Sequence, residues 1–163
     1  MPVPTKEWFS NQVTDCQTAL FRTARAILRS DADAEDAVQE TILAAYTGLE
    51  TLRDPGKFKP WILRILTNKC YGMYRSCRNT VDLEDVENIL STDHGDTAQK
   101  LSLWQAVGRL PQDQRVTITL FYYEDLNIRQ ISRVLEQSPA VVKTRLYRGR
   151  QHLKELLGEE GDL

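Results

Sequence analysis

Apolar residues recur every three or four positions along most of this 163-residue chain, and this periodicity constrains its fold more than any other feature. Such spacing places apolar side chains on one face of an α-helix. Between Trp8 and Arg29, for example, Val13, Cys16 and Leu20 fall on one side. No segment alternates apolar and polar residues as a half-buried strand does. The sequence therefore predicts an all-α protein.

The helical periodicity divides the chain into two groups of helices. We expect long helices over residues 8–29, 33–49 and 60–78, and further helices from about Ala98 onward. Between these groups, residues 79–97 are polar and acidic, as expected of a linker. The predicted organisation is two small helical domains, residues 1–79 and 98–158, joined by an acidic linker at 80–97 and followed by a tail at 159–163.

The net charge of −2 conceals an uneven distribution of charged residues. Seven basic residues and one acid lie between Arg53 and Arg78, whereas six acids and no lysine or arginine lie between Asn79 and Gln99. Residues 143–154 are basic again. Two basic blocks separated by an acidic one indicate two contacts with nucleic acid.

The second basic block lies in a segment, residues 127–156, that has the pattern of a helix-turn-helix. Asn127 is a candidate cap for a short helix, and Ser138 followed by Pro139 is typical of the start of the next. The outward face of that second helix mixes basic, small polar and aromatic side chains: Lys143, Thr144, Tyr147, Arg148 and Gln151. Such a face suits phosphates and base edges in the major groove, although a solvated basic face has the same composition.

Two further stripes have more than one interpretation. Asp36, Gln39, Glu40 and Leu43 share one face of the expected second helix, which is either solvated or a docking surface for a basic partner. The segment KFKPW, residues 57–61, interleaves aromatic rings with lysines. Such a pattern suits unstacked bases, but Phe58 and Trp61 are equally suited to the core.

Other classes of function have little support in the sequence. There is no catalytic constellation and no glycine-rich phosphate loop, so we expect no enzyme and no cofactor. Three scattered cysteines and two histidines do not predict a metal site, and a redox role for Cys70 and Cys77 is a minor alternative. No apolar run is long enough for a membrane span, and the first residues lack the apolar stretch of a signal peptide. We expect a cytoplasmic protein with no membrane insertion.

Three blocks occur in the order DAEDAVQET, KFKPWILRILTNKC and LPQDQRVTITLFYYEDLNIRQISRVLEQSPAVVKTRLYRGRQHL. Together they resemble the extracytoplasmic-function (ECF) group of bacterial RNA polymerase sigma factors. The resemblance implies a region-2 and a region-4 domain without regions 1 and 3. It also implies a promoter-specificity subunit with no catalytic activity of its own, which binds core polymerase and promoter DNA and has an inhibitory anti-sigma factor.

The resemblance assigns roles to individual positions. It implies that Asp36, Gln39 and Glu40 dock on the clamp helices of the polymerase β′ subunit, and that the apolar surface of region 4 contacts the β-flap. The residues implied to melt and bind the minus-10 element are Lys57, Phe58, Lys59, Trp61, Asn68, Tyr71, Arg75 and Arg78. Those implied to bind the minus-35 element are Lys143, Thr144, Arg145, Tyr147 and Arg148.

The sequence departs from the family pattern at several positions. Glu136 stands in a turn where the family commonly has glycine, Ser132 where it favours alanine, and Val141 where it favours threonine. After Arg78 the next charged residues are acids, beginning at Asp82, rather than a longer basic run. Two alternatives remain at this point, a stand-alone helix-turn-helix regulator that binds duplex DNA and a sigma mimic that sequesters an anti-sigma factor.

Overall fold

The computed structural model describes residues 5–78 and 102–158, except for the side chains of residues 77 and 78. Its first domain contains α1 (Lys6–Ile27), α2 (Asp31–Thr47) and α3 (Phe58–Arg78), with short 3-10 turns η1 (Leu49–Thr51) and η2 (Pro55–Lys57) before α3. The second contains α5 (Leu103–Gly108), α6 (Gln112–Ile118), the π-helical turn η3 (Thr119–Tyr123), α7 (Ile128–Leu135) and α8 (Pro139–Leu157). The described residues contain no strand, and the predicted all-α architecture of two domains is confirmed.

The helices of the first domain begin where the sequence supplies caps. The hydroxyl oxygen of Thr5 accepts a hydrogen bond from the backbone N–H of Trp8 at the start of α1, and Ser30 does the same for Asp33 at the start of α2. Both helices begin about two residues earlier than periodicity predicts, because periodicity detects buried residues and the first turn of each helix is exposed.

The core of the first domain combines small and large side chains. Ala34 and Ala37 are fully buried on α2, so its backbone packs closely against α1 and α3. Phe58, at the start of α3, is 2% exposed and makes edge-to-face ring contacts with Trp8 and Phe9. Such contacts contribute stability beyond the area they bury.

The second domain packs α6 and α7 against the long α8. The predicted apolar stripe of α8 is buried, and Gly149 lies on it. A Cβ atom at Gly149 would come within 2.8 Å of the side chain of Ile118, so glycine allows α8 and α6 to approach closely here. The helix expected around Val116 and Leu120 is α6 continuing directly into η3.

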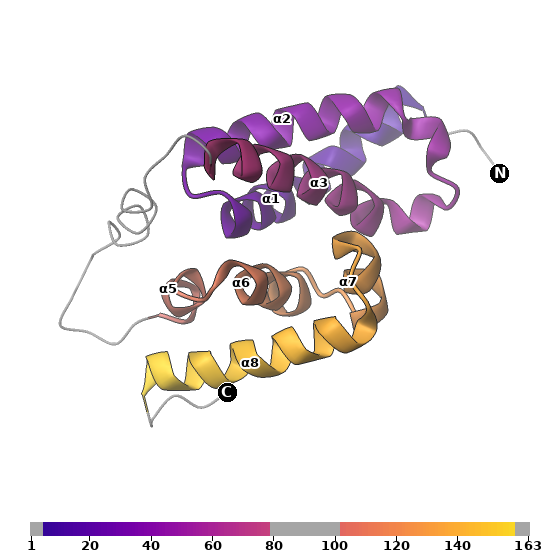
Figure 1. The fold of residues 1–163 in the computed structure, drawn as a ribbon. Helices are drawn as coiled ribbons and strands as arrows, with labels where there is room; N and C mark the ends of the chain where they lie inside the picture. Colours follow the sequence, from indigo (N-terminus) through magenta and orange to yellow (C-terminus); the bar gives the residue numbers. More distant parts are fainter. Residues whose placement is uncertain (1–4, 79–101, 159–163) are drawn as a thin grey trace.

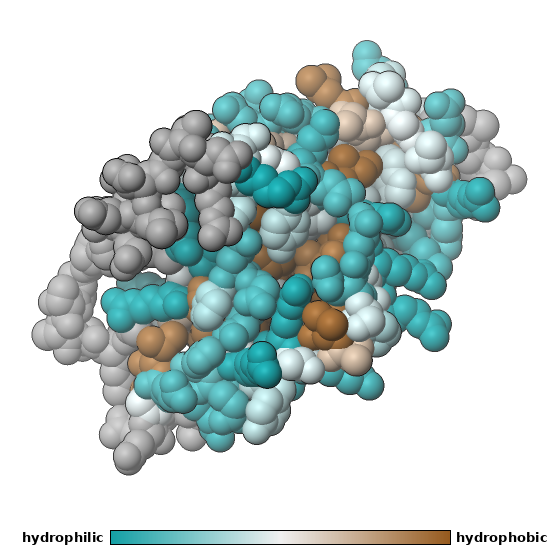
Figure 2. Space-filling view, viewed as in Figure 1, coloured by the Kyte–Doolittle hydropathy of each residue, from teal (hydrophilic) through white to brown (hydrophobic). Residues whose placement is uncertain are grey.

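The two domains lie against each other. Helix α6 packs against α1, and α7 packs against α3, while α8 lies on the side of its domain away from the first (Figure 1). Hydrophilic residues cover most of the face shown in Figure 2, and apolar residues appear as separate patches, several of them between the domains. The expected linker at 80–97 lies outside the described residues.

Candidate nucleic-acid and polymerase interfaces

The helix-turn-helix is held in shape by caps at both of its helices. At the start of α7, the Asn127 side chain accepts a hydrogen bond from the N–H of Gln130, whose side chain accepts one from the N–H of Asn127, at 2.8 and 2.9 Å. At the start of α8, Ser138 accepts from the N–H of Val141 at 3.2 Å, and Pro139 occupies the first turn. Both predicted caps are therefore present, and they fix where each helix begins.

The turn between α7 and α8 has left-handed backbone at Glu136, with φ 56° and ψ 46°. This conformation explains the family's preference for glycine at this position, because a Cβ atom is unfavourable there. The hydroxyl of Ser132 donates a hydrogen bond to the carbonyl of Gln137, and the N–H of Gln137 donates to the carbonyl of Ser132. The departures at Ser132 and Glu136 thus belong to one turn, in which a serine hydroxyl adds a hydrogen bond.

The outward face of α8 presents four of the five residues expected to contact the minus-35 element. Lys143, Thr144, Tyr147 and Arg148 are all exposed, and Tyr147 has 62% of its surface accessible. The hydroxyl of Thr144 donates to the carbonyl of Ala140, and its oxygen remains available as an acceptor. This arrangement provides a continuous polar stripe on an α-helix, an element that a major groove admits.

Arg145 differs from these four residues. Its side chain is turned toward α6, where Nε lies 3.6 Å from a carboxylate oxygen of Asp113. Arg145 also lines a cleft shared with Asn68, Tyr71 and Arg75 of α3. In this arrangement Arg145 pairs with a residue of its own domain, at the edge of this cleft, and stands apart from the exposed stripe.

The residues expected to contact the minus-10 element are spread along α3 and the turn before it. Lys57, Asn68 and Arg75 are exposed, whereas Trp61 is half-buried and in tilted ring contact with Phe58. Phe58 itself lies in the core, where its ring is unavailable for stacking on a base. Its expected role as a DNA contact therefore does not fit this structure, because packing against α1 uses the whole ring.

Two other residues of α3, Tyr71 and Arg78, were also expected to contact the minus-10 element. Tyr71 is half-buried, and burial raises the pKa of its phenol to about 12, so its hydroxyl stays protonated and remains a donor at neutral pH. Arg78 ends α3, and its side chain is outside the described residues.

A third surface lies on α2. Asp36, Gln39 and Glu40 are all exposed, and Leu43 beside them is 69% exposed. The described residues offer no ion-pair partner to either carboxylate. The stripe is therefore free to meet a partner with basic side chains.

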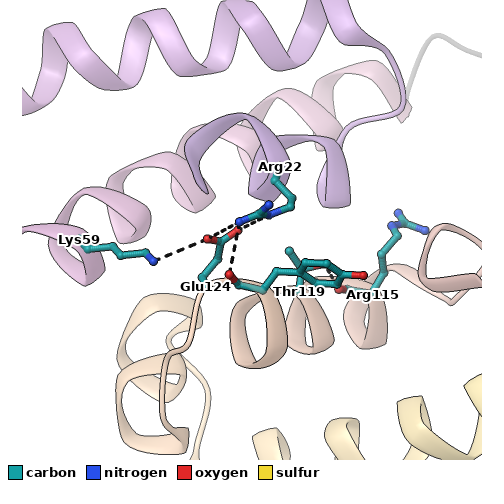
Figure 3. A network of polar contacts seen from close by, with 6 residues as sticks. Arg22, Lys59, Arg115, Thr119 and Glu124 are labelled. Carbon is teal, nitrogen blue, oxygen red and sulfur yellow. Dashed lines mark hydrogen bonds and ion pairs between the residues drawn. The ribbon is translucent and has the colours of Figure 1, made fainter. Parts of the chain in front are cut away.

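The contact between the domains is centred on Glu124, whose side chain is completely buried (Figure 3). Its carboxylate accepts hydrogen bonds from Nε and Nη2 of Arg22 on α1, at 2.7 and 3.0 Å. Lys59 on α3 approaches the same carboxylate at 3.7 Å. We call Arg22, Lys59 and Glu124 the interdomain clasp. A buried carboxylate needs such partners, since an unpaired one is strongly unfavourable.

Further polar side chains satisfy backbone groups across the same interface. Arg115 on α6, 2% exposed, donates from Nε to the carbonyl of Ala26, and Gln112 donates to the carbonyl of Ile27. These carbonyls lie at the end of α1, where helical partners are lacking. Burial lowers the pKa of Arg115 to about 9, so it stays charged at neutral pH. On α3, the hydroxyl of Thr67 donates to the carbonyl of Val134 in α7 at 3.1 Å.

Sequence reasoning missed Arg22 and Glu124 of this interface, and it assigned Lys59 to promoter DNA. Glu124 and Arg22 are 102 positions apart, and neither belongs to a local motif of charged residues. The nearest signal is the acid pair Glu124–Asp125, at the turn that follows the apolar run of η3. That turn has left-handed backbone at Asp125, with φ 58°.

The chain was compared with known proteins. A family model described as sigma-70 region 2 matches residues 13–86, and one described as sigma-70 region 4 matches residues 100–153. RNA polymerase sigma factor SigV of Bacillus subtilis is 30% identical over 158 residues, which cover 96% of this chain and 95% of that protein. The chain belongs to the sigma-70 family. The ECF RNA polymerase sigma factor SigM of Mycobacterium tuberculosis is 32% identical over 142 residues, covering 85% of this sigma factor and 71% of the relative.

Solved structures show the same fold. The sigma factor RpoE of Bartonella quintana, in complex with the anti-sigma factor NepR, matches 91% of this sigma factor and 96% of its own chain, with a TM-score of 0.74 and 24% identity. CnrH, in complex with the cytosolic domain of CnrY, matches 96% of this chain and 92% of its own, with a TM-score of 0.68 and 25% identity. The predicted membership of the ECF group and the role as a promoter-specificity subunit are confirmed, and the stand-alone regulator is not favoured.

The described residues of this sigma factor contain neither a candidate metal site nor a candidate membrane span. Within residues 5–78 and 102–158, no three histidine, cysteine or acidic side chains are grouped to hold a metal ion. None of the helices in the same ranges combines the length and apolarity that crossing a bilayer needs.

Proposed function

We propose that this sigma factor docks on core RNA polymerase in the cytoplasm through Asp36, Gln39 and Glu40, and recognises promoters through two separate surfaces. In this proposal α8 binds the minus-35 element in the major groove through Lys143, Thr144, Tyr147 and Arg148. The α3 residues with accessible polar groups bind the minus-10 element. The observation that carries the proposal is the segregation on α8, where the polar stripe is exposed and the apolar stripe is wholly buried.

The closed arrangement of the domains bears on how promoters are bound. Lys59 is engaged by Glu124, and Asn68, Tyr71 and Arg75 line a cleft with the helix-turn-helix domain. A DNA strand that reaches all of α3 needs this cleft to widen. We therefore propose that the domains separate when the protein binds polymerase and promoter.

A partner that favours the closed arrangement fits this scheme. One of the two solved structures described above holds the sigma factor RpoE with the anti-sigma factor NepR, and the other holds CnrH with the cytosolic domain of CnrY. We propose that this chain also has an anti-sigma factor. A separate proposal is that the apolar surface of this chain's region-4 domain contacts the polymerase β-flap.

The docking surface is tested by charge reversal. Asp36→Arg with Glu40→Arg should abolish promoter-specific transcription with purified core polymerase, because the reversed stripe repels a basic partner. Circular dichroism checks that the variant is folded. Asp15→Arg with Glu155→Arg reverses two exposed acids elsewhere and should leave transcription unchanged. A folded Asp36/Glu40 variant with normal transcription would refute the docking assignment.

A gel-shift assay separates this function from that of a stand-alone regulator. The protein alone should bind promoter duplex weakly and without sequence preference, whereas the same duplex should be bound specifically when core polymerase is added. Tight specific binding by the protein alone would favour the regulator.

A further inference from the structure

A cleft of about 490 Å³ lies where the start of α3 meets α7 of the other domain. Five basic side chains line it: Arg53, Lys57 and Arg64 from the first domain, and Arg129 and Arg133 from the second. We call this set the cation cleft. Asp54 is the one acid in its lining, and Leu52, Pro60, Trp61 and Val134 supply apolar walls.

Within the described residues, four of these five cations have no ion-pair partner. Arg64 lies 3.5 Å from Glu136, with about half of each side chain exposed, so this pair is weak. Within the part of the chain that the structure describes, Arg53, Lys57, Arg129 and Arg133 make no hydrogen bond or ion pair through their side chains. Asp54 accepts a hydrogen bond from the N–H of Gly56 at 2.9 Å through Oδ1, and among the described residues it forms no ion pair with the five cations.

The tertiary structure concentrates this charge. Arg129 and Arg133 are four residues apart on α7, a spacing at which like charges repel. Closure of the domains then brings them to the same cleft as Arg53 and Lys57. A bound anion would relieve this repulsion, and the planar guanidinium groups are suited to phosphate oxygens, which they can contact through two donors at once.

The size of the cleft indicates the kind of anion. Its volume lies within the range of about 300–1,000 Å³ that is typical of small-molecule sites. Five cations around such a volume match several adjacent phosphates better than a single one. We propose that the cation cleft binds a compact polyphosphate anion, either inorganic or the phosphate chain of a nucleoside polyphosphate.

Binding at this site has a consequence for the two domains. The cleft exists only while they are closed, since each domain supplies part of it, so the ligand stabilises the closed arrangement. If α3 binds the minus-10 element, as proposed above, the ligand also lowers promoter-directed transcription. This consequence rests on the proposed function, whereas binding itself does not.

Calorimetric titration of the full chain with inorganic tripolyphosphate tests the site. The salt concentration is about 0.1 M, at which exposed charges more than about 10 Å apart are strongly screened. We expect one saturable site. Arg53→Gln with Arg133→Gln removes one cation from each domain and should weaken binding about 10- to 100-fold. Lys143→Gln with Arg148→Gln removes two exposed cations of α8 and should leave binding unchanged. Absence of saturation, or an equal loss in both variants, overturns the proposal.

Two further ligands distinguish the source of the phosphates. A nucleoside triphosphate that binds about as tightly as tripolyphosphate shows that the phosphate chain is recognised, and tighter binding that falls in Trp61→Leu shows that the base contributes. Both results support the site. If an oligothymidylate binds at these residues and tripolyphosphate does not, the ligand of the cleft is a nucleic-acid strand. That result overturns the proposal.

The link to domain closure has its own tests. Arg22 lies outside the cleft, but Arg22→Ala breaks the interdomain clasp and should therefore weaken tripolyphosphate binding. Attraction of the anion to a basic surface alone would not predict this loss. Tripolyphosphate should inhibit transcription by the wild type and spare the Arg53→Gln/Arg133→Gln variant. Transcription by the Arg53→Gln/Arg133→Gln variant in the absence of tripolyphosphate tests the proposed function independently of ligand binding. Equal inhibition of both proteins contradicts the regulatory consequence.

Discussion

The carboxylate of Glu124 and the guanidinium of Arg22 are joined by two hydrogen bonds, of 2.7 and 3.0 Å, across the contact between the two domains. Glu124 is fully buried, while 27% of the Arg22 side chain is exposed. Two-point arginine–carboxylate pairs of this kind fix orientation as well as distance. The pair therefore defines how the two domains sit while they are closed.

Arg22→Ala should destabilise the closed arrangement by about 3–5 kcal/mol, because it leaves a buried carboxylate with Lys59 alone. Fluorescence energy transfer between labels on the two domains measures the separation. Arg64→Ala removes the half-exposed pair with Glu136 and should cost no more than about 1 kcal/mol. Equal effects of the two variants would mean that Glu124 is hydrated.

Glu136→Gly should stabilise the region-4 domain by about 0.5–1 kcal/mol, because glycine adopts left-handed backbone without the cost of a Cβ atom. Glu136→Ala keeps the Cβ atom and loses the ion pair with Arg64, so it should give no such gain. Thermal unfolding measures both variants. A higher melting temperature for the alanine variant than for the glycine variant would contradict the assignment.

Two glycines inside helices should respond oppositely to alanine. Gly149→Ala should destabilise the protein by about 1–3 kcal/mol, since its Cβ atom would overlap the side chain of Ile118, itself held in the core. Gly72→Ala meets nothing within 4 Å and should stabilise α3 by about 0.5–1 kcal/mol. Denaturant unfolding of the two variants compares them directly. If Gly149→Ala is also stabilising, the close approach of α8 to α6 does not require glycine at this position.

Arg148→Ala should lower discrimination at one base pair of the minus-35 element by about 1–3 kcal/mol, if its guanidinium contacts a base edge as proposed. Lys143→Ala, which removes a point charge, should weaken binding to all sequences alike. Transcription from a set of single-substitution promoters measures both. An unchanged promoter preference in Arg148→Ala excludes the residue from base recognition.

Cys70 should resist alkylation in the folded protein. Its side chain is fully buried, and burial raises the pKa of its thiol to about 12, so thiolate is scarce at about pH 8, where an exposed thiol is partly ionised. Cys16 is also buried, with a raised pKa. Mass spectrometry after iodoacetamide treatment should find both unmodified until denaturant is added. Rapid labelling of Cys70 in the folded state would revive a redox role.

The residues that local rules govern could be predicted. Helical periodicity identified the buried faces of α1 and α8, because burial repeats with the turn of a helix. Asn127, Ser138 and Pro139 marked helix starts, since a cap acts within a few residues of itself. Phe58 was harder, because the same aromatic ring suits a core and a stacking surface, and only its neighbours on α1 distinguish them.

The sequence by itself determined an all-α chain of two helical domains, the exposed stripes of α2 and α8, and membership of the ECF sigma factors. Periodicity, capping and motif order are local properties, and they survive any placement of the domains. Only the tertiary structure paired Arg22 with Glu124, turned Arg145 toward Asp113, and collected cations from both domains into one cleft. Those contacts join residues far apart in the chain, so they depend on how helices and domains pack, which no local pattern encodes.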